Sequence, residues 1–488
     1  MTDGIEDVYG GSLALLTDLY QLTMAAGYWK AGVSEREAVF HLTFRRPPFG
    51  GGYAIAAGLA PALAFLKRFR FTADDVAYLG TLRDAENKPL FERGFLDYLR
   101  ELRFTCTVDA IAEGALVFAH EPILRVRGPI LQAQLVETPL LTLINFQTLV
   151  ATKASRIVQA ARGAPVLEFG LRRAQGIDGG IAASRAAYIG GCAATSNVLA
   201  GKLCGIPVRG THAHSWVMFH GDELAAFRAY AKAMPGNVTF LVDTYDTIDG
   251  VRNAIAVARE LRTDGHELGG IRLDSGDLAH LSSQARAMLD DAGFPNAKIV
   301  ASNDLDEHLI SNIQEQGARI DVWGVGTKLA TAFDQPALGG VYKLGASRDA
   351  QGVWREAIKL SEQPIKISNP GILQVRRLRR GDEFVGDVIY DSVHGCEAPC
   401  ALHDIEDPFK KPQAPAYDST DDLLTTVMDA GRPVTLPDLE TARRRAAQDL
   451  AMLSPRTRRF LNPQPYLVGL DGHVHRRKQE LIREARNA

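Results

Sequence analysis

The sequence predicts an α/β protein whose central part is built from repeated β–α units. From Pro165 onward, short apolar runs of strand length recur, and helix-competent stretches such as Ile248–Leu261 and Leu278–Ala292 follow most of them. About eight runs within roughly 180 residues suit a compact (β/α) barrel, with a doubly wound open sheet as the alternative. The runs are Val166–Phe169, Gly191–Ala194, Pro207–Val208, Thr239–Val242, Gly270–Leu273, Lys298–Ser302, Asp321–Val325 and Gly340–Leu344.

The preceding region, residues 1–164, mixes helices and strands. Residues 17–67 predict helix, strand, a Pro/Gly turn, and then another short strand and helix, with Val39–Arg45 as a half-exposed strand. Phe104–Arg127 predicts several short β segments, and Ile130–Arg162 predicts one long helix with a bend at Pro139. We therefore expect an N-terminal α+β domain whose long helix leads into the β–α units of residues 165–345.

The last part of the chain, residues 346–488, returns to mixed strands. It is expected to complete the N-terminal domain or to form a small extra domain. Basic residues gather near its helical end, at Arg443–Arg445 and Arg476–Lys478. A charge run of this kind is typical of a solvated helix face.

Composition narrows the class of protein. The chain has 488 residues, 46% hydrophobic and 23% charged, with a net charge of −3, so neither nucleic acid nor an anionic membrane is indicated as a partner. Five cysteines do not make a disulfide framework, and the acidic N-terminus lacks the features of a signal peptide. Polar residues interrupt the most apolar stretch, Ile130–Val150, which argues against a membrane span. A cytoplasmic location is expected.

Polar, glycine-rich clusters follow several of the predicted strands, where a barrel places its active site. The first cluster is Glu168–Gly176, which contains Arg172 and Arg173. Two adjacent arginines at a strand end suit anion binding, because a guanidinium group grips phosphate or carboxylate oxygens in pairs. A surface pair neutralised by neighbouring acids is the alternative.

The second cluster is Gly210–Trp216, with histidines at 212 and 214. No Cys, Asp or Glu accompanies them at metal-ligand spacing. A histidine at a strand end can act as a base or a nucleophile near neutral pH, and a structural role is the alternative.

The third cluster is Gly270–Asp277, which an apolar strand enters and a helix leaves. Arg272 and Asp274 are two residues apart and point the same way if the strand is regular. An arginine for an acidic substrate and an aspartate for a ribose hydroxyl or Mg²⁺ form a chemically sensible set. Asp277 is placed to cap the helix, which is its structural alternative.

The fourth cluster is Trp323–Lys328, with the pattern Gly-Val-Gly-Thr. Glycines let backbone N–H groups approach a phosphate closely, and phosphate sites gather in the last third of such barrels. A tight turn is the alternative.

Other chemical motifs are weak or missing from the sequence. There is no P-loop, because Gly201–Leu203 lacks the hydroxyl and the spacing, and neither GxSxG nor a strand-linked GxGxxG occurs. His394, Cys396, Cys400 and His403 make a zinc site on paper, but CxxxC without a second pair is a poor signal, so no metal ligands are assigned.

In this order, the four clusters resemble those of the nicotinate phosphoribosyltransferase family. The resemblance begins at Thr17–Met24 and continues through Gly51–Tyr53, Asn145–Thr148 and Ala151–Lys153. It covers about residues 15–345, and the C-terminal stretch resembles the family less.

The resemblance implies an irregular (β/α) barrel packed against an N-terminal β-rich α+β domain, in a homodimer with active sites at the subunit interface. It also implies that the pyridine ring lies between two aromatic side chains, Phe169 and Tyr20 of the partner subunit. Arg272 matches the arginine beside the pyridine carboxyl group, and Arg172 matches one that binds phosphate.

His214 matches the histidine that ATP phosphorylates in this family, which would explain ATP use without a P-loop, whereas His212 has no such counterpart and is expected to be structural. Ser196 stands where the nicotinamide-using relative carries an aspartate. A serine hydroxyl can donate to the carboxylate of nicotinate, whereas an aspartate would repel it.

The implied activity joins nicotinate to phosphoribosyl pyrophosphate, giving nicotinate mononucleotide and pyrophosphate in NAD biosynthesis, with ATP as co-substrate and Mg²⁺ as cofactor. This is an ATP-dependent ligase and glycosyltransferase reaction. Asp274 and Asp277 are expected at the ribose hydroxyls or the metal, and Gly324, Gly326 and Thr327 at the 5′-phosphate.

Three alternatives remain at this point. The first is a nicotinamide or quinolinate phosphoribosyltransferase. The second is a non-catalytic homologue that only binds phosphoribosyl pyrophosphate or nicotinate; it would be expected to have lost His214 or Asp274, and both are present. The third is an aldolase-like barrel enzyme that uses Lys328 as a Schiff base.

Overall fold

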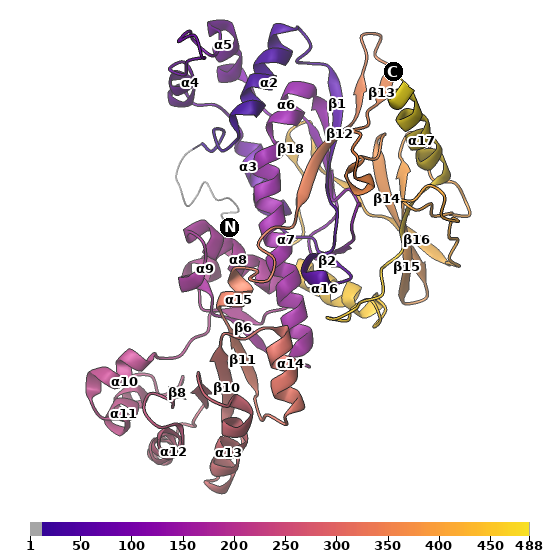
Figure 1. The fold of residues 1–488 in the computed structure, drawn as a ribbon. Coiled ribbons are helices and arrows are strands. Elements are labelled where there is room, and N and C mark those ends of the chain that lie inside the picture. The colour runs from indigo at the N-terminus through magenta and orange to yellow at the C-terminus, as the bar shows by residue number, and fades with distance from the viewer. Residues whose placement is uncertain (1–11, 488) are drawn as a thin grey trace. The chain divides into compact units, whose positions relative to one another are not determined.

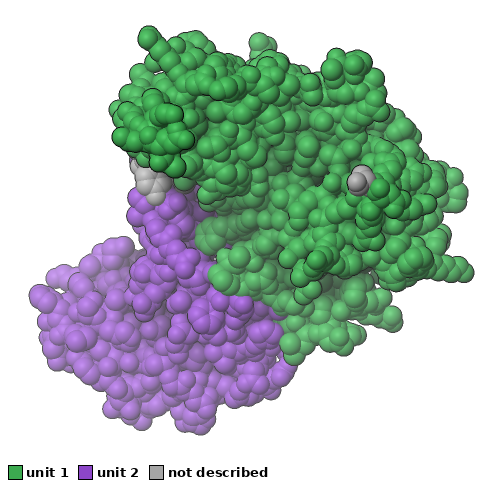
Figure 2. Space-filling view, turned by 45° about the horizontal axis from the view of Figure 1, so that its top comes forward, with its two compact units in different colours: residues 1–149, 335–488 green, residues 150–334 purple. Residues whose placement is uncertain are grey.

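A computed structural model describes residues 12–487 and divides the chain into two compact units (Figure 2). Unit 1 combines the segment that ends at Leu149 with the segment that starts at Gln335, and unit 2 is Val150–Asp334. Both boundaries fall earlier than the expected ones at 164/165 and 345/346. The segment 346–488 belongs to unit 1 together with the N-terminal segment.

Unit 1 contains a seven-stranded antiparallel sheet with the order β13-β12-β1-β5-β3-β17-β18. Its strands are β1 (Glu37–Phe44), β3 (Thr107–Ala110), β5 (Leu124–Pro129), β12 (Gly340–Arg348), β13 (Trp354–Glu356), β17 (Thr425–Asp429) and β18 (Arg432–Pro433). Strands β1, β12, β13 and β18 of this sheet are labelled in Figure 1. A separate pair joins β2 (Ala54–Ile55) to β4 (Leu116–Val117). The short β segments expected between Phe104 and Arg127 are therefore β3, β4 and the start of β5.

Strand β1 occupies an inner position in this sheet, between β5 and β12. Val39 and Phe40 point to opposite faces, and both are buried, so the strand is covered on both sides rather than half exposed. The Phe40 ring stacks on Tyr342 of β12, with centroids 5.0 Å apart and planes 7° apart.

Strand β12 corrects one sequence-based prediction. Gly340–Leu344 was expected to be a strand of the β–α units, but the run belongs to β12 and pairs antiparallel with β1. An apolar run of strand length does not specify its partner, and the helix expected after a β–α strand does not follow this one.

A four-stranded sheet with the order β16-β14-β15-β19 completes the strands of unit 1. These are β14 (Leu373–Arg380), β15 (Glu383–Asp391), β16 (Ser419–Asp422) and β19 (Val468–Leu470). Arg377 of β14 and Asp387 of β15 form a buried ion pair, with 2.6 Å between Nη2 and Oδ2. This pair connects the two central strands beneath the surface.

Helices α2 and α3 lie where the sequence predicts them, whereas α4 and α5 were not predicted. The long helix divides at Val136 rather than bending at Pro139, and its second part runs on into unit 2. The helices are α2 (Leu19–Lys30), α3 (Leu59–Arg68), α4 (Ala73–Leu79), α5 (Arg93–Glu101), α6 (Ile130–Leu135), α7 (Glu137–Ala160), α16 (Leu439–Met452) and α17 (Gly472–Asn487).

The basic end of the chain is only partly solvated. Lys478 of α17 is 3% exposed and donates to Asn369 Oδ1 and to the Ile405 carbonyl, at 2.9 and 2.8 Å. Arg445 of α16 donates to the Glu113 carbonyl at 2.5 Å. The basic run thus includes side chains that form hydrogen bonds inside unit 1, contrary to the solvated face expected from the sequence.

Unit 2 is built on a six-stranded parallel sheet with the order β7-β6-β11-β10-β9-β8. Each pair of neighbours is consecutive in the chain except β6 and β11, the first and last strands, which pair with each other. That is the cyclic order of a barrel, opened between β7 and β8, where residues 12–487 contain no joining ladder. The strands are β6 (Val166–Glu168), β7 (Ala194–Thr195), β8 (Thr239–Leu241), β9 (Gly270–Leu273), β10 (Lys298–Asn303) and β11 (Val322–Val325).

The barrel order, rather than an open doubly wound sheet, confirms the expected fold class, which combines an irregular α/β barrel with a β-rich domain that contains the N-terminal segment. Six of the eight predicted runs became its strands. A seventh, Pro207–Val208, contributes a single parallel bridge between Val208 and Thr195 at the open edge.

Helices connect the strands of unit 2, and polar caps begin most of them. Asn197, Asp246, Asp277 and Asp306 each accept a hydrogen bond from a backbone N–H in the first turn of the helix that follows. The helices are α8 (Ile177–Ile189), α9 (Val198–Cys204), α10 (His214–His220), α11 (Glu223–Ala233), α12 (Thr247–Thr263), α13 (Leu278–Asp291), α14 (Glu307–Glu315) and α15 (Thr327–Ala330).

Among the described residues, no helix combines the length and the apolar character that crossing a membrane requires.

Candidate active site

The candidate site lies at the carboxyl ends of the parallel strands in unit 2. Apolar residues such as Ile271 and Leu273 are fully buried on one face of β9, which turns Arg272 to the other face. In the parallel register Arg272 lies opposite Val300, and Ser302 lies opposite Gly324. The register therefore places Arg272, Ser302 and Gly324 on the same face of β9, β10 and β11.

Arg272 is the centre of the polar contacts on this face. Its Nε donates to Ser302 Oγ at 2.8 Å, Nη1 to Thr211 Oγ1 at 3.0 Å, and Nη2 to Asp274 Oδ1 at 2.8 Å. Ser302 Oγ also donates to Asp274 Oδ1. Arg272 and Asp274 are thus in contact, as their spacing predicts. Three hydrogen bonds fix the orientation of the Arg272 guanidinium group.

Asp274 is held as a carboxylate. Burial alone would raise its pKa, but hydrogen bonds from Ser302 and Arg272 outweigh burial and lower the pKa below its usual value. The backbone N–H of Asp274 donates to Asp243 Oδ2 at 2.9 Å, and the Ser275 hydroxyl donates to the same oxygen at 2.6 Å. The loop after β9 is therefore tied to the loop after β8.

His214 is the first residue of α10 and faces Asp274. Its Nδ1 lies 3.1 Å from Thr244 Oγ1, and its Nε2 lies 3.8 Å from Asp274 Oδ2. The His214 side chain is 40% exposed and that of Asp274 is 26% exposed. The imidazole is thus fixed at one nitrogen, and the other points toward a carboxylate in a place that a ligand can reach.

His212 has a different environment. It is buried, its Nε2 accepts a hydrogen bond from the Leu241 N–H at 3.2 Å, and its ring contacts the side chains of Phe227 and Tyr230. Burial lowers the pKa of His212. A neutral ring that accepts from a backbone amide is a structural histidine, as expected.

Phe169 covers the glycines at the end of β11. Its N–H donates to the Val325 carbonyl at 2.8 Å. A Cβ placed on Gly324 would lie 2.8 Å from two carbons of the Phe169 ring, and one placed on Gly326 would lie 3.3 Å from the Phe169 carbonyl oxygen. The ring therefore rests on backbone that only glycine leaves open, and Thr327 begins α15 directly afterwards.

Glu168 organises the ends of β6 and β7. This carboxylate is 1% exposed and accepts hydrogen bonds from Ser184 Oγ at 2.8 Å, from Thr195 Oγ1 at 2.6 Å and from the Gly170 N–H. Ser196 follows, with its N–H donating to the Glu168 carbonyl at 2.9 Å. Glu168 thus holds Phe169 and Ser196 on adjacent strand ends.

Arg172 and Arg173 lie in the short turn after Phe169 and are exposed. Among residues 12–487 neither side chain has an ion pair or a side-chain hydrogen bond. The ion pairs with neighbouring acids that the alternative interpretation requires are thus not found among the described residues.

Two other positions have structural contacts. Asp277 accepts from the His280 N–H at 3.0 Å and caps α13, so its structural alternative is realised. Lys328 donates to Asp306 Oδ2 at 2.5 Å, and that hydrogen bond raises the pKa of Lys328. A lysine held in its charged form is a poor Schiff-base nucleophile, which argues against the aldolase-like alternative.

Tyr20 lies on α2 in unit 1, whereas the other predicted site residues lie in unit 2. Its side chain is about half exposed, and burial of the remainder, together with the charge of Glu137, raises its pKa. The neighbouring Gln21 donates to Glu137 Oε2 at 2.9 Å, which fixes this face of α2.

The structure adds residues that the sequence prediction omitted. Asp243 and Thr244 follow the apolar run of β8 as the other clusters follow their strands, so the same signal was available for them. Thr211 and Ser302 are neutral hydroxyl residues without a motif. Their role depends on the strand register, which a single sequence does not specify.

A barrel-ordered parallel sheet with an arginine, carboxylates and a histidine at its carboxyl edge is typical of the catalytic domain of an α/β-barrel enzyme. Comparisons with known proteins point to one family. Family profiles described as the nicotinate phosphoribosyltransferase (NAPRTase) N-terminal domain, the NAPRTase family and the C-terminal domain match residues 15–145, 165–354 and 374–478.

Relatives match over nearly the full length. A nicotinate phosphoribosyltransferase of Bacillus subtilis is 45% identical, over 98% of this chain and 96% of its own. The human protein of the same name is 37% identical, over 93% and 94%. A crystal structure of human nicotinic acid phosphoribosyltransferase aligns with a TM-score of 0.82 and 33% identity, covering 95% of this chain and 99% of its own. The chain belongs to the nicotinate phosphoribosyltransferase family.

Proposed function

We propose that this protein transfers the phosphoribosyl group of phosphoribosyl pyrophosphate to nicotinate, forming nicotinate mononucleotide and pyrophosphate for NAD biosynthesis. We include in the proposal that ATP hydrolysis drives the reaction through a phosphohistidine at His214. The observation that carries it is the connected set of Arg272, Asp274 and His214 at the carboxyl edge of the sheet, in a chain of this family.

Nicotinate is proposed to stack on Phe169, with its carboxylate toward Arg272. A guanidinium has five N–H donors, and three hydrogen bonds to Ser302, Thr211 and Asp274 leave donors for an incoming carboxylate. Tyr20 of the partner subunit is proposed for the other face of the ring, and Ser196 as a second donor to the carboxylate. Stacking suits the flat pyridine, and the donors favour the acid over the amide.

Phosphoribosyl pyrophosphate is proposed to bind across the ends of β9 and β11. Gly324, Gly326 and Thr327 would hold the 5′-phosphate, since glycines expose backbone N–H groups to an anion. Arg172, which is unpaired in the described structure, would add a charge-assisted contact. Asp274 and Asp277 are proposed for the ribose hydroxyls, although the helix-capping bond of Asp277 leaves it only part of its acceptor capacity.

The residues present also fit Mg²⁺. Asp243 Oδ1 is buried and accepts no hydrogen bond among the described residues, and Asp274 lies on the adjoining loop. Carboxylate oxygens are the donors that a hard divalent cation prefers, so these two aspartates would hold it. When bound, Mg²⁺ would neutralise charge on the pyrophosphate oxygens.

The reaction is proposed as displacement at ribose C1. The pyridine nitrogen forms the new bond to C1 as the bond from C1 to the pyrophosphate oxygen breaks, and the electron pair of that bond leaves with pyrophosphate. Positive charge develops on C1, so the protein contributes by aligning the two substrates and by placing carboxylates near that charge. Arg272 orients the pyridine ring through its carboxylate. Asp274, whose lowered pKa keeps it ionised, lies next to Arg272 and is the carboxylate proposed for the charge on C1.

Coupling to ATP is assigned to His214. Attack on the γ-phosphorus requires a lone pair on Nε2 and therefore the proton on Nδ1, where Thr244 Oγ1 at 3.1 Å can accept it. The N–P bond forms as the bond from phosphorus to the ADP oxygen breaks. A hydrogen bond donated by Nδ1–H to Thr244 Oγ1 would thus stabilise the tautomer that the step needs.

A homodimer in the cytoplasm completes the proposal. Helix α10, which begins with His214, leaves Met218 and Phe219 exposed, Phe219 to 86%. Large apolar side chains at this exposure beside a catalytic group suit an interface with a second copy of the chain.

The test is mononucleotide formation from phosphoribosyl pyrophosphate with nicotinate, nicotinamide or quinolinate, each with and without ATP. Wild type is compared with His214→Ala and with His266→Ala, a matched control at an exposed histidine in the loop before β9, at the opposite end of that strand from the candidate site. Turnover selective for nicotinate, with ATP stimulation lost only in His214→Ala, is expected. Turnover of nicotinamide would contradict the role of Ser196, and no turnover with any pyridine would leave only a binding function.

A further inference from the structure

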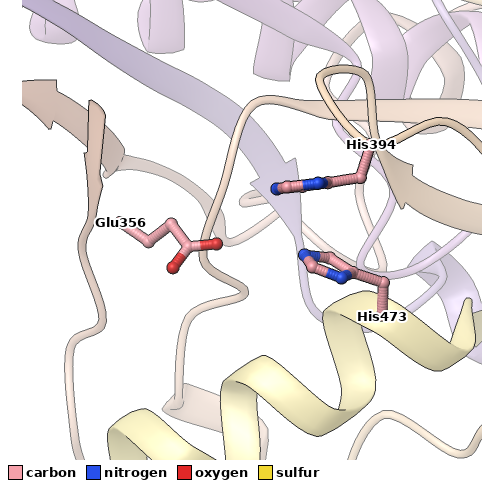
Figure 3. Close-up of side chains that lie close together, drawn as sticks. All are labelled: Glu356, His394 and His473. Atoms are coloured by element: carbon pink, nitrogen blue, oxygen red, sulfur yellow. The ribbon is translucent and has the colours of Figure 1, made fainter. Parts of the chain in front are cut away.

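A second cluster of ligand-type side chains lies in unit 1, outside the site above. Figure 3 shows Glu356 at the end of β13, His394 in the loop after β15 and His473 in the first turn of α17, with their polar ends turned toward one another. One ligand atom from each of the three lies within 4.8 Å of the others. Segments up to 117 positions apart in the chain, from 356 to 473, thus bring two imidazoles and a carboxylate together.

The polar atoms of this cluster are poorly satisfied by the protein. His473 Nε2 is buried and has no hydrogen-bond partner among the described residues. The ring of His394 lies 3.9 Å from that of His473 between centroids, and within residues 12–487 neither ring nitrogen of His394 forms a hydrogen bond. His394 is exposed to solvent, so a cost of burial applies to His473 alone. A buried imidazole nitrogen without a partner costs free energy, and it therefore indicates a ligand.

The charge around the cluster favours a cation. Glu356 Oε2 accepts from Arg477 Nε at 2.5 Å, and Arg477 Nη1 also donates to Glu480 and Glu484, at 3.1 and 3.3 Å. Three carboxylates therefore share one guanidinium. If Glu356 turns its other oxygen to a metal, Arg477 still has its hydrogen bonds to Glu480 and Glu484.

We propose that Glu356, His394 and His473 bind a divalent transition-metal ion of the Zn²⁺ type. Two imidazole nitrogens and one carboxylate oxygen form a common zinc ligand set, whereas Mg²⁺ and Ca²⁺ prefer oxygen alone. Zinc–ligand bonds of about 2.0–2.2 Å place tetrahedral ligand atoms roughly 3.3 Å apart. Side-chain rotations that move each ligand atom by about an ångström would therefore bring the three atoms to bonding distance of one ion. Water occupies the fourth position, and the Arg477 bond to Glu356 becomes the outer contact that orients the carboxylate.

The site has a structural consequence for unit 1. The ion joins β13 of the seven-stranded sheet, the loop after β15 of the four-stranded sheet and the start of α17. Since the ligands are distant in sequence, the ion binds the folded state and not the unfolded chain, and it stabilises the fold by mass action.

Neighbouring groups supply matched controls. His403 and His475 stack with centroids 4.5 Å apart, and Cys396 Sγ lies 3.6 Å from Cys400 Sγ, but none of these four belongs to the set of converging ligand atoms. The zinc set considered from sequence, which combined His394 with Cys396, Cys400 and His403, is thus replaced by a different one.

The test uses the full-length protein without a histidine tag, stripped with chelator and titrated with Zn²⁺ alone and with Co²⁺ as a spectroscopic probe. Wild type is compared with Glu356→Gln, with the double variant His394→Ala/His473→Ala, and with the control His403→Ala. His214→Ala is included to detect zinc held at the active site instead. Metal content, dissociation constant and thermal unfolding midpoint are measured for each.

One equivalent of Zn²⁺ is expected in wild type, His403→Ala and His214→Ala. Glu356→Gln, which keeps the side-chain shape, should bind at least about 10-fold more weakly, and the double variant should lose the site. Zn²⁺ at 100 times its dissociation constant should shift the unfolding equilibrium about 100-fold in wild type and not in the double variant. The proposal is overturned if wild type binds no stoichiometric zinc, or if binding survives the double variant or disappears with His214→Ala.

Discussion

Replacing Gly324 by alanine should separate the position of the Phe169 ring from the rest of the site. The new Cβ would lie 2.8 Å from Phe169 Cδ2 and Cε2, whereas non-bonded carbons rest about 3.5–4.0 Å apart. The ring must therefore move by about an ångström, because the Cβ is fixed to the buried strand β11. Overpacking of this size costs roughly 1–3 kcal/mol of unfolding free energy.

If the ring supports nicotinate, the same displacement misplaces the substrate. A shift of about an ångström can cost up to about 100-fold in rate, so we expect kcat/KM for nicotinate to fall roughly 10- to 100-fold. Steady-state kinetics in nicotinate and urea unfolding measure the two effects separately.

Gly179→Ala is the control for this experiment. Its Cβ would have no atom within 4 Å, and it lies within α8, so this change should stabilise the protein by roughly 0.5–1 kcal/mol and leave the kinetics unchanged. Loss of stability in Gly324→Ala with unchanged kinetics toward nicotinate would refute the stacking role of Phe169. No change in either property would refute the steric argument.

Three further predictions concern other contacts. Thr244→Val removes the hydrogen bond to the active-site histidine and should slow phosphohistidine formation from labelled ATP about 10-fold, while ATP-independent turnover stays unchanged. Arg377→Met leaves Asp387 buried without its partner and should cost about 3–5 kcal/mol in urea unfolding, whereas a loss below about 1 kcal/mol would contradict the burial of the pair. Burial lowers the pKa of Lys478 to about 8 from 10.5, so between pH 8 and 10.5 the unfolded chain binds more protons and the unfolding free energy of wild type should rise with pH. Lys478→Met should abolish that rise.

The β–α order of unit 2 could be predicted because each parallel strand is a short apolar run that a helix follows. The run from Gly340 to Leu344 satisfied half of that pattern, and its pairing with β1 depends on residues about 300 positions away in the chain. Local sequence does not contain this information. The alternation within β1 indicated one exposed face for the same reason, since the elements that cover the second face come from elsewhere in unit 1.

The candidate site divides in a similar way. Arg272, Asp274 and His214 stand in glycine-rich clusters with a clear chemical character, so the sequence indicated them. Thr211 and Ser302 are ordinary hydroxyl residues until the parallel register places them against the guanidinium. Glu168 was included in the first cluster, but its burial beneath Ser184 and Thr195 shows a positioning role that residue type alone does not reveal.

The division of the chain has a consequence for synthesis on the ribosome. Unit 2 is one continuous segment, Val150–Asp334, placed between the two segments of unit 1. Strand β1 can pair with β5 early, but its other edge waits for β12, which starts only at Gly340. During that interval one edge of β1, an inner strand of the finished sheet, is unpaired, and an unpaired edge is prone to aggregation. All residues of unit 2 have been synthesised by then, so unit 2 can fold. A chain that stops shortly after Asp334 should therefore yield a folded barrel attached to an insoluble N-terminal segment.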